Sequence, residues 1–241
     1  MTGRTTQLDL ELAPAEDGRA LAFSFHGAAL LADLSGVLMW PDRSMLVVAD
    51  LHLEKGSYFA AGGAPLPPYD TRATLDRLGR VIDRYRPRRI VCLGDSFHDR
   101  DAGARLDPAD AVTIAALQRR RDWVWIVGNH DPEIPAALGG DRVDAIGLDG
   151  LVFRHEAEDG ARGEVSGHYH PKARVHRRRR VLRRPCFALA DHRLILPAFG
   201  AYTGGLDVAD PALRRLLGPR FTAMLLGRTR ITALAAHQLL I

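Results

Sequence analysis

The chain of 241 residues has few cysteines, few lysines and no long apolar run. Its two cysteines, Cys92 and Cys186, lie far apart without a paired spacing, which argues against a disulfide scaffold and a thiolate metal site. The longest apolar stretches, around 28–32 and 45–49, have the length of a strand and not of a membrane span. The first residues lack the apolar stretch that a signal peptide needs. We therefore expect a reduced, cytoplasmic protein that does not contact a membrane.

Apolar residues make up 46% of the chain and charged residues 26%, which is typical of a globular protein with a full core and not of a disordered one. No proline-rich or low-complexity linker divides the sequence. We expect a flexible N-terminus at residues 1–19 and a single domain at 20–241.

The positive charge is concentrated in one segment. Two of the 33 basic residues are lysines, Lys55 and Lys172, and the remainder are arginines. Outside the segment 172–184 the chain has 25 basic and 29 acidic residues, so this segment alone makes the protein basic. It contains no acidic residue and these eight basic ones: Lys172, Arg174, Arg177, Arg178, Arg179, Arg180, Arg183 and Arg184. Such a concentration raises the question of which partner the segment contacts.

The apolar pattern indicates an α/β protein. Strands with buried character at 89–93 and 123–127 alternate with helices that begin at Asp70 or Thr71 and at Asp107-Pro108, which favours parallel central strands. The glycine- and proline-rich stretch 56–69 is expected to be a long loop. Short strands joined by tight turns are expected at 21–25, 28–32, 37–40 and 45–49. Short strands return at 143–146, 151–154, 163–166, 186–190 and 193–196, so two sheets in one domain are the simplest arrangement.

Polar side chains that can bind metal follow five of these strands. Because the carboxyl ends of parallel strands meet at one edge of a sheet, ligands normally bind there. The elements, each at a strand end, are Asp50-Leu51-His52, Gly94-Asp95, Gly128-Asn129-His130-Asp131, His155 and Gly167-His168-Tyr169-His170. Each element alone is weak evidence, since such residues often serve turns and surfaces. Five in series indicate a metal centre.

Seven side chains of these elements are candidate ligands, too many for one ion and suited to two. They are Asp50, His52, Asp95, Asn129, His155, His168 and His170. Carboxylate, imidazole and amide ligands without a thiolate favour Mn²⁺, Fe²⁺ or Zn²⁺ over Ca²⁺.

In this order, the motifs D-L-H, G-D, G-N-H-D, H and G-H-Y-H resemble those of the calcineurin-like metallophosphoesterases, over residues 50–170. The phrases V-V-A-D-L-H-L-E-K, C-L-G-D-S-F-H-D, V-G-N-H-D-P and S-G-H-Y-H-P resemble most the bacterial ligase-associated (helicase-associated) DNA damage response endonucleases of the PdeM group. The resemblance implies a β-sandwich of two mixed sheets flanked by helices.

The resemblance also implies two ligand sets that share Asp95. Asp50, His52, Asp95 and His170 would hold one ion, and Asp95, Asn129, His155 and His168 would hold the other. His130 would assist the leaving oxygen, and Asp131 would orient its imidazole from behind. Two divalent ions about 3.5–4 Å apart lower the pKa of a shared water and neutralise charge at phosphorus, so a metal-bridging hydroxide would attack in line.

The activity so implied is that of a Mn²⁺-dependent endonuclease on DNA, with single strands favoured, acting in DNA repair beside ligase, helicase and exonuclease partners. Two other functions stay open, namely a phosphodiesterase or phosphatase for a small nucleotide or phosphoprotein and a metal-binding scaffold in a repair complex. Whether the protein forms a homodimer stays open too.

The substrate contacts are the least determined part of the site. His98 stands where many family members have a carboxylate or amide, so it is either a surface residue or a phosphate contact, and Asp99 is one residue out of register to replace it. The basic segment, with Val175, Val181 and Leu182 spaced as in a hairpin, is either a solvated surface or a track for phosphates. In the second case the substrate-binding residues are Arg177, Arg178, Arg179 and Arg180. Lys55, which directly precedes the loop 56–69, would bind the substrate with them. The aromatic residues of that loop either pack or stack on an unpaired base.

Overall fold

The computed structural model describes residues 12–14, 18–63, 69–131, 133–178 and 180–240. The predicted flexible N-terminus at 1–19 lies mostly outside these residues. Within it, Ala13–Pro14 forms strand β1, which pairs antiparallel with residues 21 and 22 of the next strand. The predicted extent of the domain therefore stays a prediction.

The first sheet holds the central parallel strands that the apolar pattern predicted. Its strands β1 to β5 form an antiparallel meander, and β5 to β8 run parallel to one another. In the described residues this sheet has eight strands in sequence order: β1 (Ala13–Pro14), β2 (Ala20–Phe25), β3 (Ala28–Asp33), β4 (Leu38–Trp40), β5 (Met45–Val48), β6 (Arg89–Leu93), β7 (Asp122–Ile126) and β8 (Asp141–Val143). A short 3-10 helix, η1 (Pro41–Arg43), links β4 to β5.

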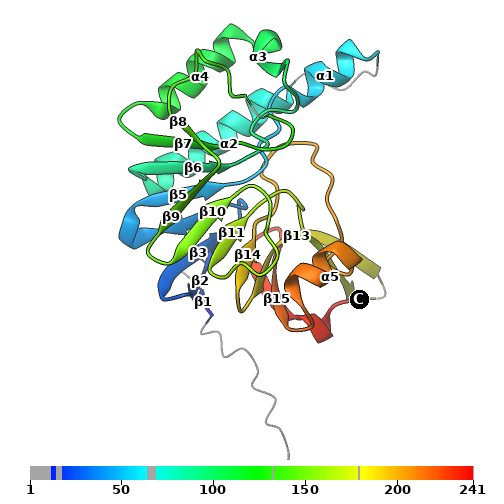
Figure 1. Ribbon diagram of the computed structural model, residues 1–241. Coiled ribbons are helices and arrows are strands. Elements are labelled where there is room, and N and C mark those ends of the chain that lie inside the picture. The colour runs from blue at the N-terminus through cyan, green and yellow to red at the C-terminus, as the bar shows by residue number, and fades with distance from the viewer. Residues whose placement is uncertain (1–11, 15–17, 64–68, 132, 179, 241) are drawn as a thin grey trace, which may run out of the picture.

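In the described ranges, four helices follow β5 and β6 in the chain, and all but the first of them pack on one face of this sheet (Figure 1). They are α1 (Lys55–Ala61), α2 (Asp70–Tyr85), α3 (Ala102–Arg105) and α4 (Pro108–Gln118). The two predicted helices are confirmed as α2 and α4, and the Asp107 carboxylate accepts the Ala109 N–H at the start of α4.

The predicted loop at 56–69 is wrong in its first half, because residues 55–61 form α1. This helix depends on a distant residue, since the Asp70 carboxylate accepts the Gly56 N–H at 2.9 Å. Such a tertiary contact outweighs a local composition rich in glycine and aromatic residues. Residues 64–68 of the predicted loop lie outside the described residues.

The second sheet has its own parallel core and a long projecting hairpin. Strands β10, β11 and β14 are parallel neighbours, and β12 pairs with β13 as a hairpin beside the sheet. The strands described are β9 (Ala145–Leu148), β10 (Leu151–Arg154), β11 (Glu164–Ser166), β12 (Lys172–Arg177), β13 (Arg180–Ala190), β14 (Arg193–Ile195), β15 (Phe221–Leu226) and β16 (Ile231–Ala235). Helix α5 (Pro211–Leu217) and the 3-10 helix η2 (Ala236–Gln238) accompany them. The single strand expected at 143–146 is two strands, because the chain passes from the first sheet to the second at Asp144.

The two sheets pack face to face, with a helical layer outside each (Figure 1). Val47, Val91 and Val124 of the first sheet contact a shared apolar core with Phe153 and Phe187 of the second. Each fully buried side chain of this size stabilises the fold by about 1.5–3 kcal/mol. The expected architecture, two mixed sheets flanked by helices, is confirmed. No helix in the described ranges is long and apolar enough to cross a membrane.

Candidate metal centre

The first sheet delivers carboxylates at the ends of adjacent parallel strands. Asp50 lies two residues beyond β5 and Asp95 lies two beyond β6. Both residues and His52 have positive φ angles, of 54°, 44° and 44°, a left-handed conformation that costs an L-residue about 1–2 kcal/mol. Hydrogen bonds hold the two loops together, since the His52 N–H donates to the Asp95 carbonyl at 2.9 Å. The loops are therefore fixed in the conformation that turns these side chains toward one point.

The second sheet delivers histidines to the same place. His155 follows β10, and His168 and His170 follow β11. The His168 backbone N–H donates to both carboxylate oxygens of Asp50 at 3.1 Å, which joins the loop of one sheet to the ligand of the other. The site therefore exists only where the two sheets meet.

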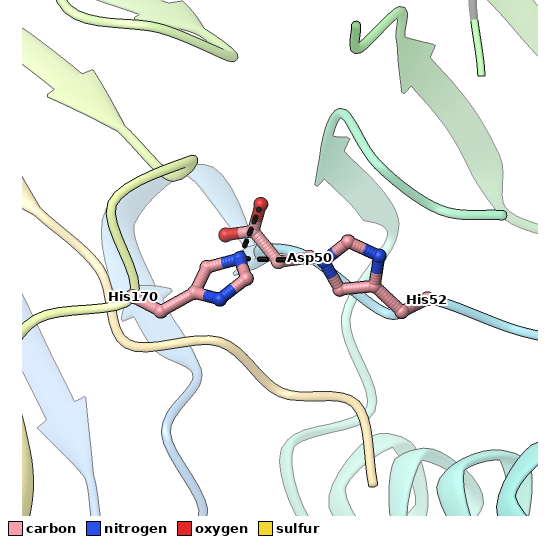
Figure 2. A group of neighbouring side chains, drawn as sticks. All are labelled: Asp50, His52 and His170. Atoms are coloured by element: carbon pink, nitrogen blue, oxygen red, sulfur yellow. Dashed lines mark hydrogen bonds and ion pairs between the residues drawn. The ribbon is translucent and has the colours of Figure 1, made fainter. Parts of the chain in front are cut away.

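One group of three side chains consists of Asp50, His52 and His170. Figure 2 shows the His170 ring turned toward both of the others, with its Nε2 3.3 Å from Asp50 Oδ1 and 3.3 Å from His52 Nε2. Their ligand atoms lie within 4.8 Å of one another, close enough to share one ion. Asp50 is buried, and His170 is half-buried at the edge of the group.

The second group consists of Asp95, His155 and His168, with Asn129 beside it. His155 Nε2 lies 3.4 Å from Asp95 Oδ1, 3.1 Å from His168 Nδ1 and 2.9 Å from Asn129 Oδ1. Asp95 also approaches the first group, because its Oδ2 is 4.0 Å from His52 Nε2. The described residues thus bring all seven predicted ligands into two adjoining groups.

The donor atoms of the second group fit a bound cation. His155 Nδ1 lies 2.9 Å from the Leu93 carbonyl and donates a proton to it, which turns Nε2 toward the site. Nε2 lies near the oxygens of Asp95 and Asn129 and near the Nδ1 of His168. These oxygen and nitrogen atoms converge on one point, where a metal ion that takes the place of the Nε2 proton would bind.

The electrostatics of the two groups differ in the protonation of their histidines. Burial lowers the pKa of His52 to about 3, against the opposing charges of Asp50 and Asp95, so its imidazole is neutral and able to ligate. Burial also disfavours a charged His155, but the hydrogen bond to Asp95 and the charges of Asp50 and Asp95 outweigh it and raise its pKa to about 9. Burial opposes ionisation of Asp95 too, yet its contacts with His155 lower its pKa to about 2. Without a metal, His155 therefore carries a proton near pH 7 and pairs with Asp95, so a metal that binds at its Nε2 would displace this proton.

Two glycines of the motifs are needed for the close approach of the two sheets. Gly94 has a φ of 70°, and a Cβ there would lie 2.4 Å from the His155 ring. A Cβ at Gly167 would lie 2.6 Å from Asp50 Oδ2. A side chain at either position would displace a ligand.

His130 lies beside the ligand groups without belonging to either. Its backbone N–H donates to Asp95 Oδ1 at 3.0 Å, and its ring Nε2 is 4.0 Å from Asp95 Oδ2. Its Nδ1 is 3.0 Å from the carbonyl of His98 and donates to it, which leaves Nε2 on the side of the site. The side chain is 45% exposed, so a substrate can reach it.

Asp131 was expected to orient the His130 imidazole, but the structure gives it another task. Its buried carboxylate accepts the backbone N–H groups of Phe97 and Gly128, both at 3.0 Å. The carbonyl of His98 holds the imidazole instead. Asp131 therefore supports the loops that carry Asp95 and Asn129, and burial raises its pKa to about 7.

His98 is part of an aromatic layer at the rim of the site. Its ring stacks on His130 at 5.7 Å with an interplanar angle of 13° and on Phe59 at 5.8 Å. Tyr58, 46% exposed, meets the His98 ring edge-on at 4.9 Å. Burial lowers the pKa of His98, so its ring is neutral near pH 7. The Asp99 carboxylate pairs with Arg105 and does not replace the missing ligand-supporting group.

Both lysines of the chain lie near the site. The charge of Lys55 lowers the pKa of His52 and His98, and it also lowers that of Lys172, which is lowered most by burial. Lys172 donates to the Thr203 carbonyl at 3.2 Å. Arg183 donates to the carbonyl of Gly205 at 2.7 Å, and Gly205 packs on the His170 backbone. Lys172 and Arg183 thus border the site at the base of the β12–β13 hairpin.

The arginines predicted to bind substrate lie at the other end of that hairpin. Arg177 and Arg180 pair across its tip, and Arg178, in the turn between them, is exposed. Arg179 and the side chain of Arg177 lie outside what the structure describes. The substrate contacts predicted at the tip of the hairpin stay a prediction. The residues at its base, Lys172 and Arg183, were not predicted to bind substrate, and the scarcity of lysine is the one feature of the sequence that sets Lys172 apart.

A sandwich of two mixed sheets with two buried carboxylate–histidine groups at its strand ends defines a metal-dependent hydrolase. The family model of the calcineurin-like phosphoesterases matches residues 44–192, a range that contains every predicted ligand. The chain belongs to this family, as the motifs predicted.

Several solved structures match this one, among them a nuclease and a phosphoesterase. The crystal structure of Pseudomonas putida nuclease MPE is 32% identical in sequence, with a TM-score of 0.68, and the match covers 88% of this chain and 100% of that one. YfcE, a phosphoesterase from E. coli, is 13% identical with a TM-score of 0.41 over 80% of this chain and 98% of its own, too distant to bear on function. Comparison with curated proteins gave no match.

Proposed function

We propose that this protein is a phosphodiesterase that cleaves DNA internally, favouring single strands, and that Mn²⁺ is the metal it uses. The observation that carries the proposal is the position of Lys55, Lys172 and Arg183 around two metal-binding groups. A phosphodiester strand carries one negative charge per nucleotide, which such a basic border attracts. The similarity to a nuclease over the whole of that nuclease's length supports a nucleic acid as the substrate.

Each ion would be held by residues from both sheets. Asp50, His52 and His170 would hold one, and Asn129, His155 and His168 the other, with Asp95 between them. When bound, the two ions would supply Lewis-acid activation of a water and neutralise charge on the phosphate. The chain itself supplies the fixed loops, the neutral His52 imidazole and the hydrogen bond that orients His155.

His130 is the residue we assign to the leaving group. Because its Nδ1 proton is held by the His98 carbonyl, only Nε2 is free to act on the substrate side. A proton on Nε2 can be given to the leaving oxygen as the P–O bond breaks, which is general acid catalysis. The stacked His98 ring keeps the imidazole in the plane in which Nε2 faces the ligand groups.

The aromatic layer favours an unpaired base. Tyr58 is exposed next to Phe59 and His98, so a base that is not stacked in a duplex can lie against these rings. Duplex DNA would first have to unstack, at a cost of a few kcal/mol. The role in DNA repair and the ligase, helicase and exonuclease partners rest on the family resemblance alone and stay predictions.

The test is cleavage of circular single-stranded DNA with Mn²⁺, with Mn²⁺ plus chelator, and beside a duplex circle of the same sequence. We expect linearisation of the single-stranded circle that the chelator abolishes, because a circle has no end for an exonuclease. Hydrolysis of bis(p-nitrophenyl) phosphate is the parallel assay. Turnover of that ester without cleavage of DNA would overturn the DNA assignment in favour of a small-nucleotide phosphodiesterase. Turnover of neither would favour a scaffold.

A further inference from the structure

A basic cavity lies beside residues 198–200, whose backbone is hydrogen-bonded to that of Ala49 and Asp50. It has a volume of about 500 Å³ and lies between α2, the residues after β3 and the end of β15. Its lining contains Arg19, Arg77, Arg80, Arg84 and Arg228 and a single carboxylate, Asp33. A cavity with five guanidinium groups and one acid is built for an anion.

The single carboxylate is already committed to other groups. Asp33 accepts the Tyr85 hydroxyl at 2.6 Å and the Ser35 backbone N–H at 2.7 Å, and Arg84 lies 3.6 Å away. In the described part of the chain no carboxylate forms an ion pair with Arg77, Arg80 or Arg228. Three positive charges in this cavity thus lack a counter-ion among the described residues.

Arg77 is held in a conformation that suits a ligand. Its guanidinium lies 3.9 Å from the centre of the Phe199 ring, and its buried Nε has no hydrogen-bond partner in the described residues. Burial and the charge of Arg80 lower the pKa of Arg77 to about 10. A stacked guanidinium keeps its N–H groups in one plane, ready for two parallel bonds to a phosphate.

The cavity is tied to the metal centre by a short segment of backbone. Phe199 donates its N–H to the Ala49 carbonyl at 2.8 Å, and Gly200 donates to the Asp50 carbonyl at 2.9 Å. One turn before Arg77, the Thr74 hydroxyl accepts the Ala201 N–H at 3.1 Å. Phe199 therefore has Arg77 against its ring, while the residue after it contacts the backbone of the ligand Asp50.

We propose that this cavity, through Arg77, Arg80 and Arg228, binds a backbone phosphate of the DNA strand that is cleaved at the metal centre. The inference rests on the proposed function. It adds a second point of attachment, so that a strand long enough to reach both is held at two phosphates. A dinucleotide or a small phosphodiester reaches only one.

The test compares the triple variant R77Q/R80Q/R228Q with R86Q/R88Q/R119Q, which removes three charges from a separate basic cavity. The measured quantity is the ratio of two values of kcat/KM, that for a long single strand divided by that for bis(p-nitrophenyl) phosphate. The strand is longer than about 16 nucleotides, the upper range of a single-strand binding site. We expect this ratio to fall about tenfold in the first variant, the worth of a charge-assisted hydrogen bond, and to hold in the second. The salt dependence of strand binding should flatten by about 0.7 per lost phosphate contact.

Because Arg77 packs on Phe199, a second variant guards against misfolding. R80Q/R228Q changes two exposed side chains and should lower the same ratio, with an unaltered melting temperature. An equal ratio in the wild type and both cavity variants, while the wild type cleaves DNA, would overturn the cavity assignment alone. If the ratio falls as far for a dinucleotide as for the long strand, Arg77 acts through Phe199 and the inference is again wrong. A wild type that hydrolyses only the small ester would remove the proposed function and this inference together.

Discussion

The two sheets contribute different chemistry to one centre. The first sheet supplies Asp50, Asp95 and Asn129, the candidate oxygen ligands, whereas the second supplies His155, His168 and His170. His52 is the one candidate imidazole ligand from the first sheet. Neither sheet alone presents a complete set of donor atoms to an ion. Bound metal would therefore link the two sheets, and its binding would increase the free energy of unfolding.

This difference predicts the largest loss for Asp95, the oxygen ligand that approaches both groups. Asp95→Asn removes its charge, and we expect kcat/KM for bis(p-nitrophenyl) phosphate to fall by more than the about 10- to 100-fold that losing an outer partner of a ligand costs. Metal content, measured by plasma mass spectrometry, should fall with it. Asp99→Asn is the matched control, because that carboxylate, four residues on, pairs with Arg105. Equal activity of the two variants would contradict a shared role for Asp95.

A loss of about 10²–10⁴-fold is expected for His130→Ala, since general acid catalysis is typically worth that much. Both ions should remain, because His130 lies outside the two ligand groups. His237 is an exposed histidine of η2, and the same assays on His237→Ala serve as the control for loss of a histidine outside the site. If His130→Ala loses metal in parallel with activity, the residue is a ligand and its assignment to the leaving group fails.

The link between the sheets is tested by stability. With Mn²⁺ at 100 times its dissociation constant, the free energy of unfolding should rise by about 2.7 kcal/mol per site over that of the chelated protein. Chemical unfolding of His52→Ala and of His170→Ala, with and without metal, distinguishes the contributions of the two sheets to metal binding. Both variants lie in one group, so both should lose the same part of this increment. An increment lost only in His52→Ala would mean that the first sheet binds the ion by itself.

The smallest effect concerns Glu164, which lies fully buried in β11 between Arg193, at 3.2 Å, and Arg154, at 3.5 Å. Burial raises its pKa, against the charges of Arg193, Arg154 and His192. The folded protein therefore binds this proton more tightly than the unfolded chain does. The resulting stabilisation is complete below the ordinary glutamate value of 4.5 and is lost as the pH rises through the raised pKa.

Glu164→Gln lacks this titration, so the stability of the wild type relative to the variant should decline as the pH rises from 4.5. Urea unfolding at a series of pH values measures the decline. A difference that grows with pH would mean that the two arginines prevail over burial.

The grouping of the candidate ligands could be predicted because these residues follow strands. Asp50, Asp95 and Asn129 each come shortly after an apolar run, and the carboxyl ends of parallel strands lie at one edge of a sheet. The order of the motifs then indicated that the later histidines belong to the same site. The support of these residues could not be predicted. Asp131 contacts the backbone of Phe97, 34 positions away, and α1 depends on Asp70, which lies beyond residues 64–68. Such contacts form when segments that are distant in the sequence pack together, so the local sequence does not indicate them.

The scarcity of lysine has a practical consequence. Lys55 and Lys172 are the only two in the chain, and both lie at the border of the metal centre. Burial lowers the pKa of each, so a larger share of each amine is unprotonated and nucleophilic. An amine-directed acylating reagent would therefore modify no side-chain amine remote from this border. Mass spectrometry of its adducts then becomes a footprint of the substrate, with protection of either lysine reporting directly on occupancy.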